Sequence, residues 1–280
     1  MSRYYIKIKG LLANQFYIYS HYFLTTFKPT TSFNVLFSKK VWWDKLIEKG
    51  PFAPHYNASF SKFEISNIQT FDLVVPLTIP DLEFCMANKS LLGNNPLPFP
   101  SIESFTICNN KGEFDIFMRK YGFSIYLPDP ILKDQFPFIL KNVIDEGGEN
   151  VYVINNANDQ DRHKEIMHSP TYLKQGVIKG KKEYATHILI KNGKIINALT
   201  IIYIFDKPVY IKGKDQYICR NICKNKHIDL FEEVLIKMNF NGLCCFNYKE
   251  ENGIPKILEI NPRFGGSLCE FFYPFLQKAI

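Results

Sequence analysis

The stretch from 258 to 266, Leu-Glu-Ile-Asn-Pro-Arg-Phe-Gly-Gly, constrains this chain more than any other. A strand through its first half would place Glu259 and Asn261 on one face, because side chains alternate along a strand. Pro262 has no N–H for a sheet ladder, so we expect the strand to end there, just before Arg263. A carboxylate and an amide suit Mg²⁺, and an arginine suits phosphate. The pattern therefore favours a metal and phosphate site, although a buried edge strand followed by a surface turn would have the same spacing.

Composition is typical of a globular protein that binds an anionic ligand. The 280 residues are 46% hydrophobic and 15% aromatic, enough for a sizeable core, and the net charge is +7. No block of five or six like charges occurs, which argues against a nucleic-acid partner. The seven cysteines include no CxxC pair, so we expect reduced thiols in a cytoplasmic protein. Lysines interrupt the N-terminal apolar run, so we expect neither a signal peptide nor a membrane span.

The first hundred residues alternate between strand and helix patterns, which is typical of a small α/β unit. We expect strands near 4–9, 34–37 and 71–76, and helices near 11–27, 42–49 and 81–89. No GxGxxG motif occurs there, so we infer no dinucleotide site. The segment 93–101 contains three prolines and predicts a domain boundary.

Two lysines after this boundary could meet an anion. Lys111 stands near the start of a predicted helix that runs to about residue 121, where it could reach an anion or simply be solvated. The apolar run 136–141 predicts a strand that ends in Lys141, and an inward lysine needs an anionic partner. Gly147-Gly148 and a second strand at 151–154 then predict a hairpin with a mobile tip.

The rest of the chain predicts a second, larger set of hairpins. The expected strands are 171–178, 182–190, 195–205, 243–248 and the stretch that ends at Asn261, with helices at 158–167 and 228–238 and a solvated basic loop at 207–225. The hairpin around Gly253 would bring Asn247 near Glu259 and Asn261.

The sequence Leu-Glu-Ile-Asn-Pro-Arg-Phe-Gly-Gly-Ser resembles the metal-and-phosphate segment of ATP-grasp enzymes, most closely the carbamoyl-phosphate-synthase-like branch. The resemblance covers roughly residues 70 to 270. It implies an α/β (α+β) fold in which two α+β lobes hold the nucleotide. It also implies a Rossmann-like pre-ATP-grasp domain at 1–99 and an ATP-grasp domain at 100–280, with a lid lobe at about 123–175.

The same resemblance implies ATP and Mg²⁺ as cofactors, with Mn²⁺ as a substitute, and assigns a role to each motif. The nucleotide would be held by Lys111, Lys141, Gly147, Gly148, Gln175, Gly176, Val177, Ile178 and Glu183. The metal would be held by Asn247, Glu259 and Asn261. The catalytic groups would be Arg263, Lys141 and Gly266.

The sequence departs from the family pattern at several of these positions. Asn247 stands where the family usually has Asp or Glu, and Gly176 replaces a family Glu. His187 takes a place that is often Asp; it is either structural or a group that titrates near neutrality. Acidic residues beside the glycine turn would repel phosphate, so we expect Asp145, Glu146 and Glu149 to face solvent. In the basic loop, Lys212 or Arg220 could instead reach an acceptor pocket.

The resemblance implies a ligase that joins a carboxylate to an amine through an acylphosphate and releases ADP and phosphate. Its substrates would be small molecules such as an amino acid, a peptide or an amino sugar, without nucleic acid or membrane, and a homodimer is left open. Three alternatives remain: a degenerate nucleotide-binding protein without turnover, an enzyme that carboxylates or forms carbamoyl phosphate, and a plain α/β interaction module.

Overall fold

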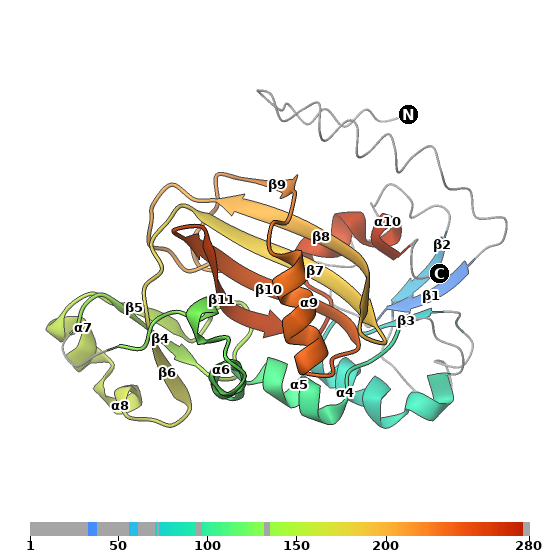
Figure 1. The fold of residues 1–280 in the computed structure, drawn as a ribbon, viewed down its shortest axis with the longest axis horizontal. Helices are drawn as coiled ribbons and strands as arrows, with labels where there is room; N and C mark the ends of the chain where they lie inside the picture. Colours follow the sequence, from blue (N-terminus) through green and yellow to red (C-terminus); the bar gives the residue numbers. More distant parts are fainter. Residues whose placement is uncertain are drawn as a thin grey trace.

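The computed structural model describes residues 71, 73–92, 97–131 and 135–276, together with the backbone of two strands at 33–37 and 56–60. The strand expected at 4–9 and the helices expected at 11–27 and 42–49 lie outside the described residues. The described strands form three sheets, arranged as a small lobe on one side, a large central sheet and a parallel sheet on the other side (Figure 1). No helix in the described ranges has the length and apolar character needed to cross a membrane.

The parallel sheet contains the strands expected early in the chain. Its order is β2-β1-β3, with β1 at Phe33–Phe37, β2 at Tyr56–Phe60 and β3 at Leu73–Val75. We predicted β1 and β3 but not β2. Helix α4 (Ile79–Ala87) follows, capped by Thr78, and it buries the predicted face of Leu82 and Cys85.

The large sheet is antiparallel, in the order β11-β10-β7-β8-β9. Its strands are β7 (Lys182–Lys191), β8 (Lys194–Ile204), β9 (Cys219–Cys223), β10 (Gly242–Glu251) and β11 (Ile254–Asn261). The predicted hairpins are confirmed, and Asn192 and Gly193 both have positive φ at the turn between β7 and β8. Strand β9 lies inside the segment that we expected to be a solvated loop, so that expectation was wrong.

One face of this sheet is covered by helices. Helix α9 (Ile228–Lys237) packs Phe231, Val234 and Leu235 against apolar side chains of β7, β10 and β11. Helix α6 (Lys111–Lys120) contributes Phe114 and Phe117 to the same core, and α5 (Ile102–Asn109) precedes it. The opposite face of β10 and β11 is therefore left for polar side chains.

The small lobe is a three-stranded antiparallel sheet with the order β5-β4-β6. Its elements are β4 (Phe138–Asn142), β5 (Val151–Ile154), β6 (Tyr172–Gly176), α7 (Ala157–Arg162) and α8 (Lys164–Met167). The single helix expected at 158–167 is thus two short helices. Phe138, Leu140, Ile154 and Met167 form a separate core, so the lobe packs around its own apolar side chains.

The C-terminal segment connects the parallel sheet to the large sheet. Strand β11 ends at Asn261, as Pro262 predicts, and is followed by the 3-10 helix η4 (Gly266–Phe271) and helix α10 (Phe272–Leu276). Two further 3-10 helices lie earlier in the chain, η2 (Lys89–Leu92) and η3 (Ser124–Tyr126). Phe264, Leu268 and Phe272 share one core with Leu73 and Val75 of β3. The turn after β11 is therefore held in place by burial.

Candidate active site

Three side chains converge where β10 and β11 pair. Asn247 lies opposite Glu259 in the register, next to a bulge, and Asn261 follows two residues later on the same face. The Glu259 Oε1 atom accepts hydrogen bonds from Asn247 Nδ2 at 2.8 Å and from Asn261 Nδ2 at 3.0 Å. The structure thus brings together the three residues predicted as metal ligands.

Two predicted lysines meet this cluster from other elements. Lys111, at the start of α6, has its Nζ atom 3.3 Å from Glu259 Oε2 and donates to the Asp145 carbonyl oxygen at 3.2 Å. Lys141, on β4 of the small lobe, donates to the carbonyl oxygen of Leu258 at 2.9 Å. Had Lys141 and Glu259 opened into unrelated cavities, the nucleotide-site interpretation would have failed.

A third lysine, Lys212, also lies in the cluster. It comes from the segment between β8 and β9 and donates to Asn247 Oδ1 at 3.0 Å. Its Nζ atom lies 3.4 Å from a carboxylate oxygen of Glu183 and 4.6 Å from the centre of the Tyr203 ring. Our preferred interpretation, a solvated Lys212, was wrong. Arg220 lies on β9 instead, where it pairs with Glu270 at 2.7 Å.

Burial and charge shift the pKa values in the cluster. Burial alone would raise the pKa of Glu259, but Lys111, the two amides and Lys141 together lower it to about 2. Burial, together with the nearby Lys111 charge, lowers the pKa of Lys141 to about 8. Burial raises the pKa of Glu183. Burial alone would lower the pKa of Lys212, but Glu183, with smaller contributions from Tyr203, Cys245 and Glu259, raises it. The site therefore combines one firmly ionised carboxylate with ammonium groups that lack full solvation.

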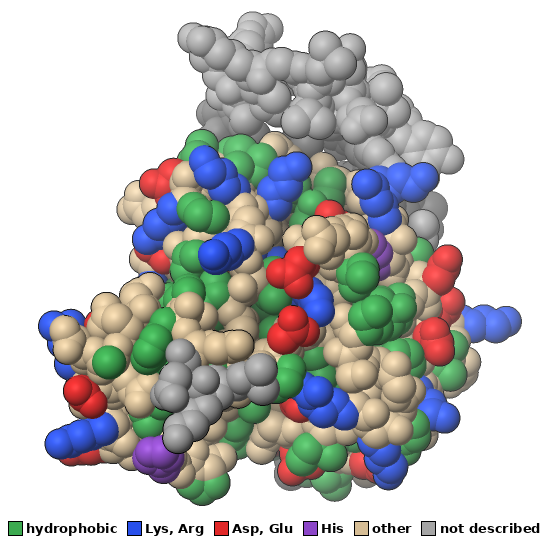
Figure 2. Space-filling view, turned by 60° about the vertical axis from the view of Figure 1, so that its left-hand side comes forward, with side chains coloured by type: hydrophobic (Ala, Val, Ile, Leu, Met, Phe, Trp, Pro, Cys, Tyr) green, Lys and Arg blue, Asp and Glu red, His purple; other side chains and the backbone are tan. Residues whose placement is uncertain are grey.

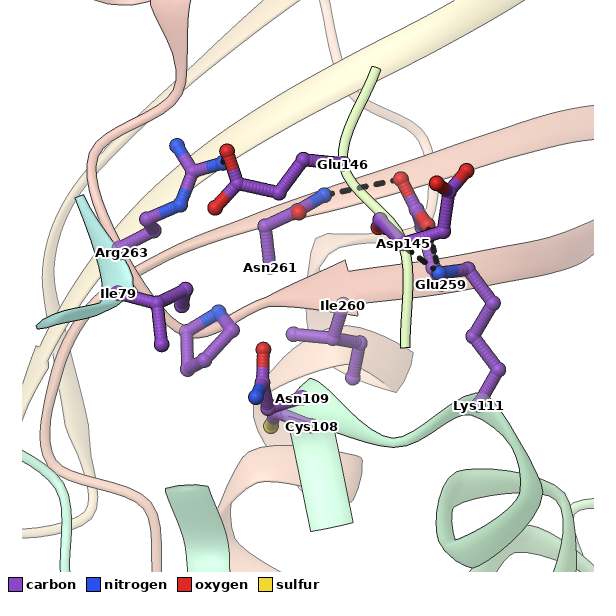
Figure 3. A pocket seen from close by; sticks show the side chains of 11 residues that line it. Ile79, Cys108, Asn109, Lys111, Asp145, Glu146, Glu259, Ile260, Asn261 and Arg263 are labelled. Atoms are coloured by element: carbon purple, nitrogen blue, oxygen red, sulfur yellow. Dashed lines mark hydrogen bonds and ion pairs between the residues drawn. The ribbon is translucent and has the colours of Figure 1, made fainter. Parts of the chain in front are cut away.

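Arg263 lies at the end of the cluster and is buried. It pairs with Glu146 at 3.2 Å and donates to the carbonyl oxygen of Phe264 at 2.9 Å. Glu146 is exposed, as expected, but the turn of the small lobe also places its carboxylate against Arg263, a contact that we did not predict. The pocket in Figure 3 is lined by Ile79, Cys108, Asn109, Lys111, Asp145, Glu146, Glu259, Ile260, Asn261, Pro262 and Arg263.

The glycine turn of the small lobe packs against the segment that carries Lys212. Gly147 and Gly148 have φ values of 69° and 75°, which suit glycine. A Cβ atom on Gly148 would lie 2.9 Å from the Lys212 carbonyl oxygen, and one on Gly213 would fall well below 3.0 Å from the Gly147 carbonyl oxygen. The close approach of these two backbones depends on glycine on both sides.

The predicted adenine hinge connects the small lobe to β7. Gln175 and Ile178 are buried, Val177 lies between the lobes, and Gly176 donates through its N–H to the Asp129 carbonyl oxygen at 2.8 Å. A Cβ atom at position 176 would lie 3.2 Å from that same oxygen, so the backbone geometry disfavours the family's glutamate there.

His187 is fully buried beside the turn that contains Gly266. Its Nε2 atom lies 2.7 Å from Ser267 Oγ. Burial, with a contribution from Lys212, lowers the pKa of His187 to about 3. The interpretation in which His187 titrates near neutrality was therefore wrong.

Comparison with known proteins assigns the family. A family model of the ATP-grasp domain matches residues 108–267. The chain belongs to the ATP-grasp family. Predicted metal and phosphate residues of this ATP-grasp chain, Lys111 to Gly266, all lie within the matched range. A search of curated protein sequences finds no match.

Solved structures agree with the ATP-grasp fold. D-alanine–D-alanine ligase from Bacillus anthracis matches with a TM-score of 0.58 at 12% identity, over 89% of this chain and 97% of its own. L-amino acid ligase from Bacillus licheniformis matches with a TM-score of 0.59 at 14% identity, over 86% and 69%. Phosphoribosylamine–glycine ligase from Thermotoga maritima gives 0.61 at 14%, over 85% and 70%. At such identities the likeness supports the fold alone.

The donor set fits a hard cation. Within the described ranges, no group of three or more His, Cys, Asp and Glu side chains could hold a metal. One carboxylate and two amides nevertheless supply oxygen atoms of the kind that Mg²⁺ and Mn²⁺ bind. Both basic and acidic side chains are scattered over the face shown in Figure 2.

Proposed function

We propose that this protein is an ATP- and Mg²⁺-dependent ligase that joins a carboxylate to an amine and releases ADP and phosphate. One observation carries the proposal. Three lysines from separate elements converge on Glu259 and Asn247, which hydrogen-bond to each other. Lys111 forms an ion pair with Glu259, Lys212 donates to Asn247, and Lys141 donates to the carbonyl oxygen of Leu258, the residue before Glu259. Three ammonium groups face two carboxylates, Glu259 and Glu183, and the remaining positive charge suits a triphosphate.

Each lysine would approach this triphosphate from a different element. Lys141 reaches from the small lobe, and Lys111 reaches from the start of α6. Lys212 comes from the segment that packs against the glycine turn at Gly147 and Gly148. We assign all three to phosphate charge, and we assign the backbone from Gln175 to Ile178 to the adenine edge.

Mg²⁺ would be held by Glu259 and Asn261, with Asn247 assisting, and when bound it supplies positive charge to phosphate oxygens. Glu259 remains ionised across the physiological range, because its pKa is lowered to about 2. The amide oxygens add no charge, so Glu259 provides most of the electrostatic attraction for the cation.

The substrate carboxylate would attack the γ-phosphorus of ATP, which gives ADP and an acylphosphate. An amine would then displace phosphate from this intermediate and form an amide. We assign Arg263 and the backbone N–H groups at Gly265 and Gly266 to the negative charge of the intermediate. Glu146 pairs with Arg263 here, so a substrate that enters has to take over that guanidinium. No covalent protein nucleophile is needed, since positioning and charge stabilisation suffice.

The test is ADP release with pooled carboxylic acids and amines, followed by mass spectrometry of the product. Amino acids, peptides and amino sugars form the first panel. We expect ADP release that depends on one acid and one amine, and loss of that release in Glu259→Gln. ADP release without any acid-dependent product would count against the ligase.

A second function, nucleotide binding without turnover, is favoured by the metal set itself. Asn247 brings no charge and its Oδ1 atom already accepts from Lys212 at 3.0 Å. A carboxylating or carbamoyl-phosphate-forming reaction remains an option within the family. Stabilisation by Mg-ATP in a thermal shift assay with no ADP release would favour the binding protein, and no thermal shift would favour an interaction module.

We further infer a domain boundary at 99/100, with the lid lobe at about 123–175. The prolines before Ser101 motivate the boundary, and the separate core of the small lobe motivates the lid. All seven cysteines are free, which suits the reducing cytoplasm. Limited proteolysis tests the boundary: cleavage between 93 and 101 should yield a stable C-terminal fragment.

A further inference from the structure

His187 and Ser267 form a pair beside the turn after β11, and this pair has no part in the chemistry described above. His187 sits on β7 with 0% of its surface exposed, and Ser267 is half-buried in η4, directly after Gly265 and Gly266. Their side chains meet at 2.7 Å between Nε2 and Oγ. This is a short contact for a nitrogen and an oxygen, so the two groups hold each other firmly.

The pair adjoins the metal set. Cys245 Sγ lies 4.0 Å from His187 Nε2 and 3.9 Å from Asn247 Oδ1, so one thiol separates the imidazole from a predicted metal ligand. Gly265 closes the other side, since a Cβ atom there would lie 2.6 Å from His187 Cε1. The imidazole is therefore locked between β10 and the turn after β11.

The hydrogen bonds of the pair indicate the position of the imidazole proton. His187 Nδ1 is buried and has no hydrogen-bond partner among the described residues. A buried N–H without an acceptor is costly and rare. The proton is therefore better placed on Nε2, where Ser267 Oγ accepts it. The serine hydroxyl then has its own proton left to donate, and no acceptor for it is found in the described part of the chain.

We propose that His187 is a positioning residue that turns the Ser267 hydroxyl toward the substrate, where it donates a hydrogen bond to an oxygen of the carboxylate substrate. This inference rests on the proposed ligase function. Ser267 lies four residues after Arg263 and directly after the glycines assigned to the acylphosphate, so its donor adds to theirs. Because His187 is fully buried, it acts on a substrate only through Ser267, and the role proposed for it is to position that hydroxyl.

The first test reads the imidazole tautomer in the full chain. Histidine labelled with ¹⁵N gives distinct long-range ¹H–¹⁵N spectra for the Nε2–H and Nδ1–H forms, and His187→Gln assigns the signal. His227→Gln is the matched control, because His227 is a half-buried histidine with a carboxylate partner, Glu250, at 2.8 Å. We expect neutral Nε2–H from about pH 6 to pH 9, on both sides of the usual histidine pKa. An Nδ1–H form, or titration in this range, would overturn the proposal.

The second test separates substrate binding from nucleotide binding. Ser267→Ala should raise KM for the carboxylate about 10- to 100-fold, the loss of one hydrogen bond to a charged group, with the Kd of Mg-ATP unchanged. His187→Leu should act in the same direction, and His187→Gln should recover part of the loss, because its amide can donate near the Nε2 position. Equal impairment of the Gln and Leu variants, or no effect of Ser267→Ala, would refute the role.

The two proposals fail in different ways. If no carboxylate is turned over, the proposed ligase function is refuted. The NMR signal of the His187 imidazole is then followed while acetate is added in the presence of Mg-ADP. We expect a saturable shift of the Nε2–H resonance that Ser267→Ala abolishes. A resonance that does not respond to acetate would overturn the positioning role, whatever the fate of the ligase.

Discussion

Gly213→Ala should separate the glycine turn of the small lobe from the segment that carries Lys212. Gly213 has a φ of 102°, and its Cβ atom would lie well under 3.0 Å from the Gly147 carbonyl oxygen. The left-handed backbone alone costs about 1–2 kcal/mol for an L residue. The overlap adds a displacement of roughly 1.5 to 2 Å between the two backbones before ordinary contact distance is restored. Both effects destabilise the closed arrangement of the lobe.

Gly253→Ala is the matched control for this change. Gly253 also has positive φ, at 80°, but nothing lies within 4 Å of the position of its Cβ atom. Both variants should lose about 1–2 kcal/mol of stability from the backbone, or about 2–8 °C in Tm for a chain of this size. Only Gly213→Ala should also weaken Mg-ATP binding, by at least about tenfold, which is about 1.4 kcal/mol. Isothermal titration that gives equal Kd values for both variants would refute a role for this contact.

Three further changes test the charges of the cluster. Asn247→Asp should strengthen Mn²⁺ binding by titration, since it adds a second negative charge beside Glu259, whose carboxylate lies 2.8 Å from the Asn247 amide. Asn156→Asp, at an exposed helix N-cap, should not. Lys212→Met should lower Tm, because buried Glu183 loses its ion-pair partner, and it should reduce ADP release about 100-fold, because a charge assigned to the phosphates is lost. Lys207→Met, at an exposed lysine, should change Tm and ADP release little. Glu259→Gln should destabilise the protein above pH 4.5, the usual pKa of that group, and the free energies of unfolding of variant and wild type should converge as pH falls toward 2.

Sequence pattern predicted the elements whose signal is local. The strand that ends at Pro262 and the helix at 228–238 needed only the alternation of side chains, the proline or an apolar stripe. The hairpin register then places Asn247 beside Glu259, so the metal set could be predicted before its geometry was known. The resemblance also pointed to Lys111 and Lys141, and the structure brings both to this set, while their role in phosphate binding stays a prediction.

Contacts between distant segments could not be predicted in this way. Lys212 comes from a segment of basic residues that has no period, and its place in the cluster depends on the approach of Gly213 to Gly147. The ion pair between Glu146 and Arg263 was missed for a similar reason, because it depends on how the small lobe sits on the large sheet. The pKa of His187 required knowledge of burial, which a lone histidine in a strand does not reveal.

The departures from the family pattern have physical explanations within this chain. At position 176, a Cβ atom would crowd the Asp129 carbonyl oxygen. At position 247, the asparagine accepts a hydrogen bond from Lys212, whose ammonium would pair with a carboxylate more strongly than with an amide. An aspartate at 247 would hold Lys212 as an ion-pair partner and compete with phosphate for it, whereas the amide leaves the ammonium easier to transfer. The neutral Asn247 thus attracts the metal cation less strongly than aspartate would, and it leaves Lys212 more available to bind phosphate. The balance between these two effects decides between turnover and binding alone, and Asn247→Asp alters both at once in opposite directions.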